Sequence, residues 1–164
     1  MAFRSALVGL LLVVLGGCSS NSLSGPIEFV HTFDRPSETS TWAANGEAID
    51  IGLLCQSATG FLPSFEDENG NVRTLEELEE LNQGSVPFVS VSVEQMACND
   101  GSGNFTLRFI NQVDPTTAEG IVGVTWAIDG GAEYDDMAGS GSSELPQSRG
   151  NIIVWTASGT MTAN

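Results

Sequence analysis

The stretch Cys98-Asn99-Asp100-Gly101-Ser102-Gly103-Asn104-Phe105-Thr106-Leu107-Arg108-Phe109 decides the fold of this chain. It joins a cysteine, a glycine-rich turn and a strand in which apolar and polar side chains alternate. Phe105, Leu107 and Phe109 fall on one face of that strand, and the polar residues between them fall on the other. A strand with one dry face and one wet face is typical of an antiparallel sheet.

The same alternation, bounded by turn residues, predicts further strands on both sides of this stretch. With the opening stretch included, we expect strands at residues 27–33, 48–54, 87–93, 98–111, 120–129, 137–145 and 151–162. Residues 42–46 are expected to be irregular, and residues 60–71 to form a loop. The chain also predicts one short helix, which Thr74 and Glu77 begin as a capping box and which Gly84 ends.

Short strands separated by turns indicate an all-β domain. We expect an antiparallel β-barrel of about eight strands with one short helix, and a β-sandwich is the alternative. Either would occupy a single domain at residues 27–164. One face of the strand at residues 120–129 carries Val122, Val124, Trp126 and Ile128. Glycines inside the strand patterns mark bends of a closing barrel or bulges of a sandwich, and they lie at positions 123, 139, 141 and 159.

The beginning of the chain resembles the signal peptide of a bacterial lipoprotein. Arg4 precedes an apolar run at residues 6–15 that is too short to span a bilayer. The run ends in Leu15-Gly16-Gly17-Cys18, which is similar to a lipobox. The resemblance implies a signal peptide at residues 1–17, lipidation of Cys18 and a polar tether at residues 18–26. Serine after the cysteine resembles the pattern of outer-membrane lipoproteins, and an ordinary secretory signal peptide is the alternative.

The three cysteines support export to an oxidising compartment. Lipidation of Cys18 leaves Cys55 and Cys98, which we expect to form a disulfide. Two buried free thiols are the alternative. A metal site is less favoured, because His31 is the sole histidine of the sequence and lies far along the chain from Cys98.

The charge of the chain is strongly negative, with 21 acidic residues against five basic ones and a net charge of -16. Such a surface repels nucleic acid and anionic lipid, so the expected contact with a membrane is the lipid anchor alone. Two acidic segments are candidates for calcium binding, although neither has the spacing of an EF-hand and turn formation also explains them. Their candidate ligands are Asp67, Asn69, Asn71, Asp129, Glu133, Asp135 and Asp136. No other cofactor is expected.

The C-terminal half has a pattern of glycine, aromatic and strand residues, at Cys98, Asp100, Gly101, Phe105, Arg108, Gly120, Gly123, Trp126, Ile128, Gly130, Gly131, Tyr134, Met137, Gly139 and Gly141. In this pattern it resembles small secreted bacterial β-proteins, and its glycine turn is similar to that of barrels of the dirigent and allene oxide cyclase type. The resemblance implies an eight-stranded antiparallel barrel, and it carries over no catalytic residue. The turn between Gly131 and Tyr134 is one residue shorter than in that type.

Aromatic and sulfur-bearing side chains of the strands could line a ligand pocket or simply fill the core. These residues are Phe88, Phe105, Phe109, Trp126, Tyr134, Met137 and Trp155. The sequence has no lysine and no sequence-evident nucleophile–base pair, and His31 has no evident partner. We therefore expect a non-catalytic envelope lipoprotein that binds a small apolar ligand or a partner protein. The alternatives are a purely structural envelope protein, a cyclase- or isomerase-like enzyme, and a calcium-dependent structural or adhesion protein.

Overall fold

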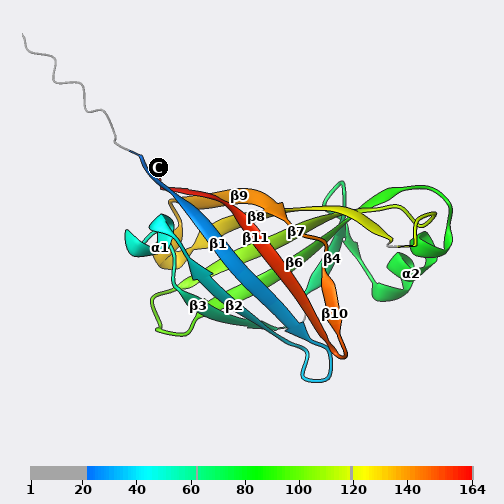
Figure 1. The fold of residues 1–164 in the computed structure, drawn as a ribbon, viewed down its shortest axis with the longest axis horizontal. Coiled ribbons are helices and arrows are strands. Elements are labelled where there is room, and N and C mark those ends of the chain that lie inside the picture. Colours follow the sequence, from blue (N-terminus) through cyan, green and yellow to red (C-terminus); the bar gives the residue numbers. More distant parts are fainter. Residues whose placement is uncertain (1–21, 62, 119, 164) are drawn as a thin grey trace, which may run out of the picture.

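The computed structural model describes residues 22–61, 63–118 and 120–163. In these residues the chain forms a closed antiparallel β-barrel of eight strands, with further strands outside the ring (Figure 1). The structure therefore confirms the expected barrel and not the alternative sandwich. The elements are β1 (Leu23–Asp34), β2 (Thr39–Asn45), α1 (Glu47–Asp50), β3 (Ser57–Phe61), β4 (Ser64–Asp67), β5 (Val72–Arg73), α2 (Leu75–Gln83), β6 (Phe88–Cys98), β7 (Asn104–Val113), β8 (Ile121–Gly131), η1 (Ala132–Tyr134), β9 (Met137–Ser143), β10 (Gln147–Arg149) and β11 (Ile152–Ala163).

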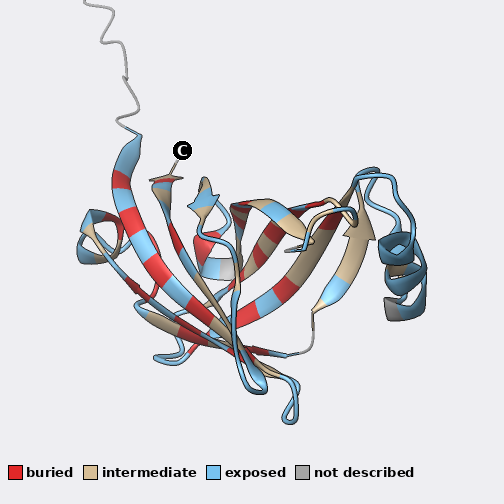
Figure 2. Ribbon diagram, turned by 45° about the vertical axis from the view of Figure 1, so that its right-hand side comes forward, coloured by how far each residue is buried: buried red, intermediate tan, exposed pale blue. Residues whose placement is uncertain are grey.

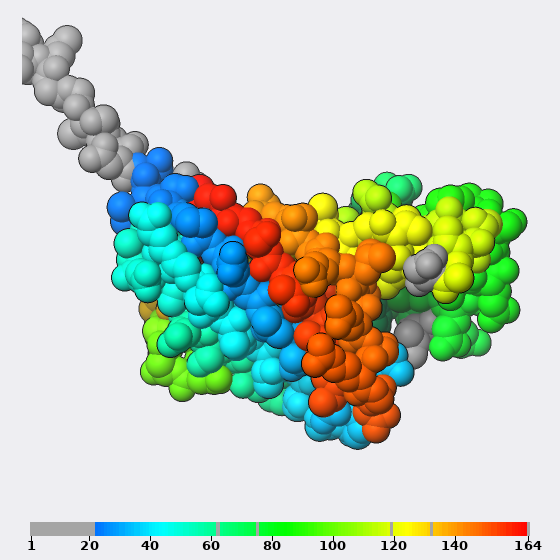
Figure 3. All heavy atoms as spheres, in the orientation of Figure 1, coloured from blue at the N-terminus to red at the C-terminus, as the bar shows by residue number. Residues whose placement is uncertain are grey.

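The ring follows the order of the chain, with β1, β2, β3, β6, β7, β8, β9 and β11 as successive neighbours. Within this order β3 pairs with β6 across the inserted β4, β5 and α2, and the ring closes where β1 pairs with β11. The β1–β11 pairing is the more extensive of these two. It runs over the full length of both strands, from Leu23 opposite Ala163 to Asp34 opposite Ile152. β1 and β11 lie side by side as the blue and red bands across the face seen in Figure 3. β4 and β5 continue the wall beyond β3, and β10 pairs with β11.

Alternation along the strands divides the inside of the barrel from its surface. On β7 the side chains of Phe105, Leu107 and Phe109 are buried, as the sequence predicted. The same alternation appears on β1 as bands of buried and exposed residues along the strand that continues from the grey trace (Figure 2). β1 and β7 therefore contribute every second side chain to the interior.

One end of the barrel is closed by a segment that the sequence analysis had assigned to a strand. Residues 48–54 form α1 and a turn, so that prediction was wrong. Ala48, Leu53 and Leu54 do not alternate across a sheet but are all buried in the barrel core. The segment leads into Cys55, which forms the predicted disulfide with Cys98. The covalent bond thus holds the closing segment against the end of β6.

Three other segments also differ from the sequence prediction. The irregular segment at 42–46 lies mostly in β2, where the polar Ser40 takes an inward position and weakens the apolar pattern. The loop expected at 60–71 contains part of β3 and all of β4. Gly60 sits there because a Cβ atom would come within 2.5 Å of the Met96 sulfur. β1 begins at Leu23, inside the segment assigned to the tether.

The strand at 120–129 is present as β8, but its first residues face differently from the prediction. Val124, Trp126 and Ile128 are buried, whereas Val122 is 49% exposed. The register between β7 and β8 shifts beside Val113, which pairs with Ile121 instead of Val122. This bulge reverses the alternation, because one extra residue moves the following side chain to the other face.

Trp126 explains two glycines of the neighbouring strands, Gly141 on β9 and Gly159 on β11. A Cβ atom on Gly159 would lie 2.5 Å from the Trp126 ring, and one on Gly141 would lie 2.8 Å from its indole nitrogen. The indole N–H donates to the Ser158 carbonyl at 3.1 Å. The large ring therefore occupies space that side chains on the two strands would otherwise take.

Helix α2 forms where the sequence predicted it. The Thr74 side chain accepts from the Glu77 N–H, and the Glu77 carboxylate accepts from the Thr74 N–H at 2.7 Å. This reciprocal capping box satisfies two donors that the first turn leaves free. The helix ends at Gly84 and lies at the opposite end of the molecule from α1 (Figure 1).

Candidate functional site

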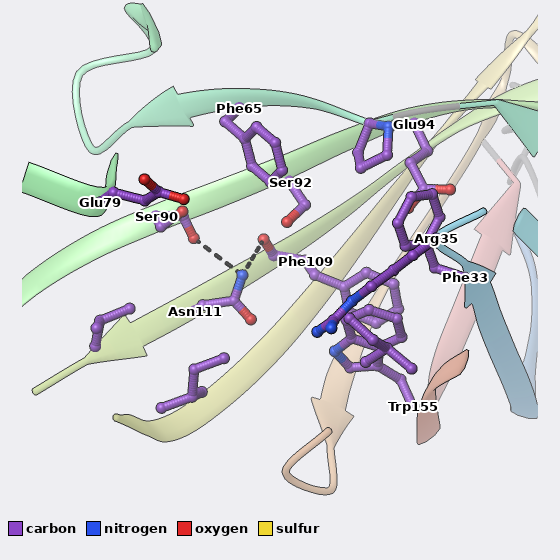
Figure 4. Close-up of a pocket in the computed structure, with 14 residues that line it drawn as sticks. Phe33, Arg35, Phe65, Glu79, Ser90, Ser92, Glu94, Phe109, Asn111 and Trp155 are labelled. Atoms are coloured by element: carbon purple, nitrogen blue, oxygen red, sulfur yellow. Dashed lines mark hydrogen bonds between the residues drawn. The ribbon is translucent and has the colours of Figure 1, made fainter. Parts of the chain in front are cut away.

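The barrel is filled at one end and hollow at the other. Around α1 the interior holds a packed core that includes Phe29, Trp42, Phe105, Trp126 and Met161. Towards the other end the interior widens into a cavity of about 510 Å³ (Figure 4). The cavity is lined by Phe33, Arg35, Pro63, Phe65, Glu79, Ser90, Ser92, Glu94, Phe109, Asn111, Val113, Ile121, Ile153 and Trp155.

The cavity lies where the wall of the barrel is incomplete. β9 pairs with β8 only as far as Val124, so the first residues of β8 pair with β7 alone. At the same level β10 replaces β9 as the neighbour of β11. The wall is therefore interrupted between β8 and β10, next to the lining residues Ile121 of β8 and Ile153 of β11.

Aromatic rings form one wall of the cavity. Phe109 on β7 and Trp155 on β11 are stacked, with ring centroids 5.2 Å apart and an angle of 20° between their planes. The His31 ring lies behind them, 5.1 Å from each. Phe33 and Phe65 complete the apolar lining. Such a wall suits a flat or largely apolar group, because aromatic rings bury a large area and prefer stacked or edge contacts.

Two polar atoms of the lining are buried without a hydrogen-bond partner among the described residues, the Asn111 Oδ1 and the Trp155 Nε1. The Asn111 amide group donates from Nδ2 to the Ser90 carbonyl at 3.3 Å, which orients its oxygen away from that strand (Figure 4). An unsatisfied buried polar atom costs about 1–3 kcal/mol. A ligand with a donor and an acceptor at these two points would remove that cost.

A buried cluster of His31, Ser40 and Glu94 lies at the inner end of the cavity. His31 and Ser40 are fully buried, and Glu94 is 3% exposed. The Ser40 hydroxyl donates to Glu94 Oε2, and His31 Nε2 lies 3.1 Å from the same oxygen. Since the serine contacts the carboxylate and not the imidazole, this is not the arrangement of an activated serine nucleophile.

Sequence reasoning considered His31 alone and missed the other two members of the cluster. The inward position of Glu94 could have been predicted, because Glu94 pairs with Leu107 across β6 and β7. Leu107 belongs to the inward set of the opening stretch, so its cross-strand neighbour must also face the interior. The same register turns Ser90 and Ser92 into the cavity and leaves the valines of β6 on the outer face.

The seven residues proposed for a pocket fall into separate places. Phe109 and Trp155 line the cavity, whereas Phe105 and Trp126 belong to the filled core. Met137 packs against that core. Tyr134 is buried, and its hydroxyl lies 2.7 Å from the Ser102 hydroxyl at the glycine-rich turn. Phe88 borders a shallow depression beside α2.

The first acidic candidate segment is organised by its own hydrogen bonds. Asp67 accepts from the backbone and side chain of Asn71, from the Asn69 N–H and from Arg73. The hydrogen bonds from Asn71 above all hold the pKa of the Asp67 carboxyl well below its usual range. Asn71 turns its amide donor and not its oxygen towards the carboxylate, which is the geometry of a turn.

The second acidic segment is spread over the end of β8 and the turn that follows. Asp129 forms an ion pair with Arg108 across β7 and β8. Glu133, Asp135 and Asp136 lie in or next to η1. The described parts of the chain bring no three His, Cys, Asp or Glu side chains into a group that could hold a metal ion.

The helices of the described residues are too short or too polar to cross a membrane. No protein-family model matches the chain, and comparison with curated proteins and with solved structures gives no significant match.

Proposed function

We propose that this protein is an exported, lipid-anchored binding protein that holds a small, largely apolar ligand in the open half of its barrel. The cavity is the observation that supports the binding role. Its volume of about 510 Å³ lies in the range of sites for small molecules, which is about 300–1,000 Å³. Its lining also has the composition of such sites, with a mostly apolar wall and a few polar atoms that face one ligand.

Filling the cavity should abolish binding of a neutral apolar probe. We expect Ser92→Phe to reduce the fluorescence enhancement of N-phenylnaphthylamine at least tenfold, because the new ring would occupy the space beside Phe109. The matched control is Val91→Phe, which adds the same ring on the outer face of β6. Equal enhancement in Ser92→Phe and in the unmodified protein would contradict a binding site inside the barrel.

The lipid anchor is proposed from the sequence, since Cys18 lies outside the described residues. Its support is the lipobox-like segment before Cys18 together with a disulfide, which is typical of an oxidising compartment. Ser19 favours delivery to the outer membrane. The anchor would hold the barrel at the cell envelope through its N-terminal end, near the start of β1.

Cys18→Ala should abolish incorporation of a labelled fatty acid and release the protein from the membrane fraction. The reason is that the proposed lipid is attached to the thiol of this residue. The measurement is metabolic labelling followed by fractionation and intact-mass analysis. An unmodified mature N-terminus at another residue of the unaltered protein would contradict the proposal.

A second candidate function is a cyclase- or isomerase-like enzyme, which one observation favours. Glu94 brings a buried carboxylate to the cavity, where it could accept a proton from a bound substrate. The test is chemical conversion of the bound ligand by the unmodified protein and by Glu94→Gln. If the ligand is recovered unchanged from both proteins, the enzyme hypothesis is contradicted and the binding function remains.

A further inference from the structure

We infer that the ligand of the cavity is an amphiphilic amine, whose ammonium group meets Glu94 at the inner end while its apolar body packs against Phe109 and Trp155. This inference rests on the proposed binding function and specifies the chemistry of its ligand. It comes from the distribution of donors and acceptors in the lining.

Glu94 has one occupied oxygen and one oxygen available to a ligand. His31 and Ser40 both contact Oε2, and Oε1 accepts no hydrogen bond from residues that the structure describes. Glu94 belongs to the lining of the cavity although it is 3% exposed. His31 and Ser40 serve one oxygen of this buried carboxylate, and His31 can form an ion pair with it when protonated. The other oxygen faces the cavity side without a donor among the described residues and favours a ligand group that carries N–H donors and positive charge.

The other polar groups of the lining add one acceptor and one donor, of which Asn111 lies further out, at the level of Ser90. Asn111 presents Oδ1 and is 7% exposed, and its amide nitrogen is engaged by a backbone carbonyl. Trp155 Nε1 is the single unpaired donor among the buried atoms of the described lining, and it could serve a hydroxyl or ether oxygen of the ligand. Two acceptors, one of them a carboxylate, therefore face one neutral donor.

The net charge of the whole chain favours a cationic ligand, whereas the two charges at the cavity rim have opposite signs. Glu79 on α2 and Arg35 after β1 are both exposed members of the lining, so solvent screens each of them. Their opposite signs leave no net preference at the rim. The chain as a whole carries a net charge of -16, which attracts cations and disfavours anionic ligands.

The aromatic wall gives the amine a place for its apolar body. The stacked pair of Phe109 and Trp155 offers a flat surface next to the polar end of the cavity. A ring system can pack there, and an ammonium group beside aromatic faces gains a further electrostatic attraction. The cavity is thus complementary to both ends of such a molecule.

The test compares three ligands that share one ring system and differ in the head group. Naphthylethylamine, naphthylethanol and naphthylacetate are titrated into the full-length protein by isothermal calorimetry at neutral pH. We expect the amine to bind at least tenfold more tightly than the alcohol, and the carboxylate to bind most weakly. The order follows because, of the three head groups, the ammonium alone brings positive charge and several N–H donors to the free oxygen of Glu94, whereas the carboxylate places a like charge beside it.

Glu94→Gln should remove this selectivity, since the amide keeps the shape of the side chain and loses its charge. We expect the affinity for the amine to fall at least tenfold and the affinity for the alcohol to change less than threefold. The matched control is Glu80→Gln, the same chemical change at an exposed residue of α2 outside the cavity lining, which should leave the ratio of the two affinities unaltered. If Glu94→Gln does not fold, the order of the three ligands in the unmodified protein decides.

Two outcomes separate this inference from the proposed function. If the alcohol or the carboxylate binds as tightly as the amine, or if none of the three binds while N-phenylnaphthylamine does, the amine preference is overturned and the binding role stands. If neither the three ligands nor N-phenylnaphthylamine binds, both are overturned. Equal loss of selectivity in Glu80→Gln and Glu94→Gln would also overturn the assignment to Glu94.

Discussion

Replacing Cys55 and Cys98 together with alanine is expected to lower the free energy of unfolding by about 4 kcal/mol. The two cysteines are 43 residues apart in the sequence, so their bond restricts a long loop of the unfolded chain. The same bond holds the closing segment on the barrel, where Leu53 and Leu54 are buried. The loss should appear as a lower midpoint of chemical denaturation.

The matched control for this prediction is the unmodified protein under reducing conditions. It should unfold at nearly the same denaturant concentration as the double variant, since both lack the same covalent bond. A loss below about 1 kcal/mol would show that the bond adds little to the restraint that packing already provides.

Gly159→Ala is expected to destabilise the barrel by about 3 kcal/mol, at the upper end of the cost of overpacking. The added Cβ atom would lie 2.2 Å from the Ser140 carbonyl oxygen and 2.5 Å from the Trp126 ring. Neither obstacle is a flexible chain end, so the pairing of β9 with β11 or the position of Trp126 must change. Thermal denaturation and the fluorescence of the protein would report both effects.

Gly123→Ala is the matched control, because it makes the same chemical change on another strand of the same sheet. Its Cβ atom would meet only the end of the Gln112 side chain, at 3.0 Å, and that side chain can move aside. We expect a change of about 0.5 kcal/mol or less, as for surface substitutions in general. Equal destabilisation by the two variants would contradict the role assigned to Trp126.

Sequence patterns predicted those parts of the fold whose structure depends on interactions between residues close together in the chain. The inward set of β7 follows from a period of two, and α2 follows from a capping box that needs only four residues. The pairing of Cys55 with Cys98 follows from counting. The segment at 48–54 was missed because its apolar residues pack on the end of a barrel, a surface that exists only after the strands have assembled.

The candidate site was harder to predict, because alternation specifies the face of a strand but not the depth along the barrel. Phe105 and Phe109 belong to the same inward set, yet the first lies in the filled half and the second lines the cavity. The wall of the barrel is interrupted where the pairing of β9 with β8 ends, and this point decides which of the two rings faces the cavity. No local sequence pattern encodes where that pairing ends. Glu94 could have been found by extending the register from Leu107 across the neighbouring strand.

The pairing of β1 with β11 has a consequence for the order of folding. Most neighbouring strands of the ring are joined by short connections and can form as local hairpins. The pairing of β1 with β11, in contrast, joins the first strand of the barrel to the last. Bringing these two strands together costs conformational entropy of the long intervening chain before any contact between them forms. We therefore expect the pairing of β1 with β11 to be the slowest step of folding. During synthesis, the barrel cannot close until β11 has been translated and has left the ribosome. A chain that stops before Ile152 would leave β1 as an unpaired sheet edge, which is prone to pair with other molecules.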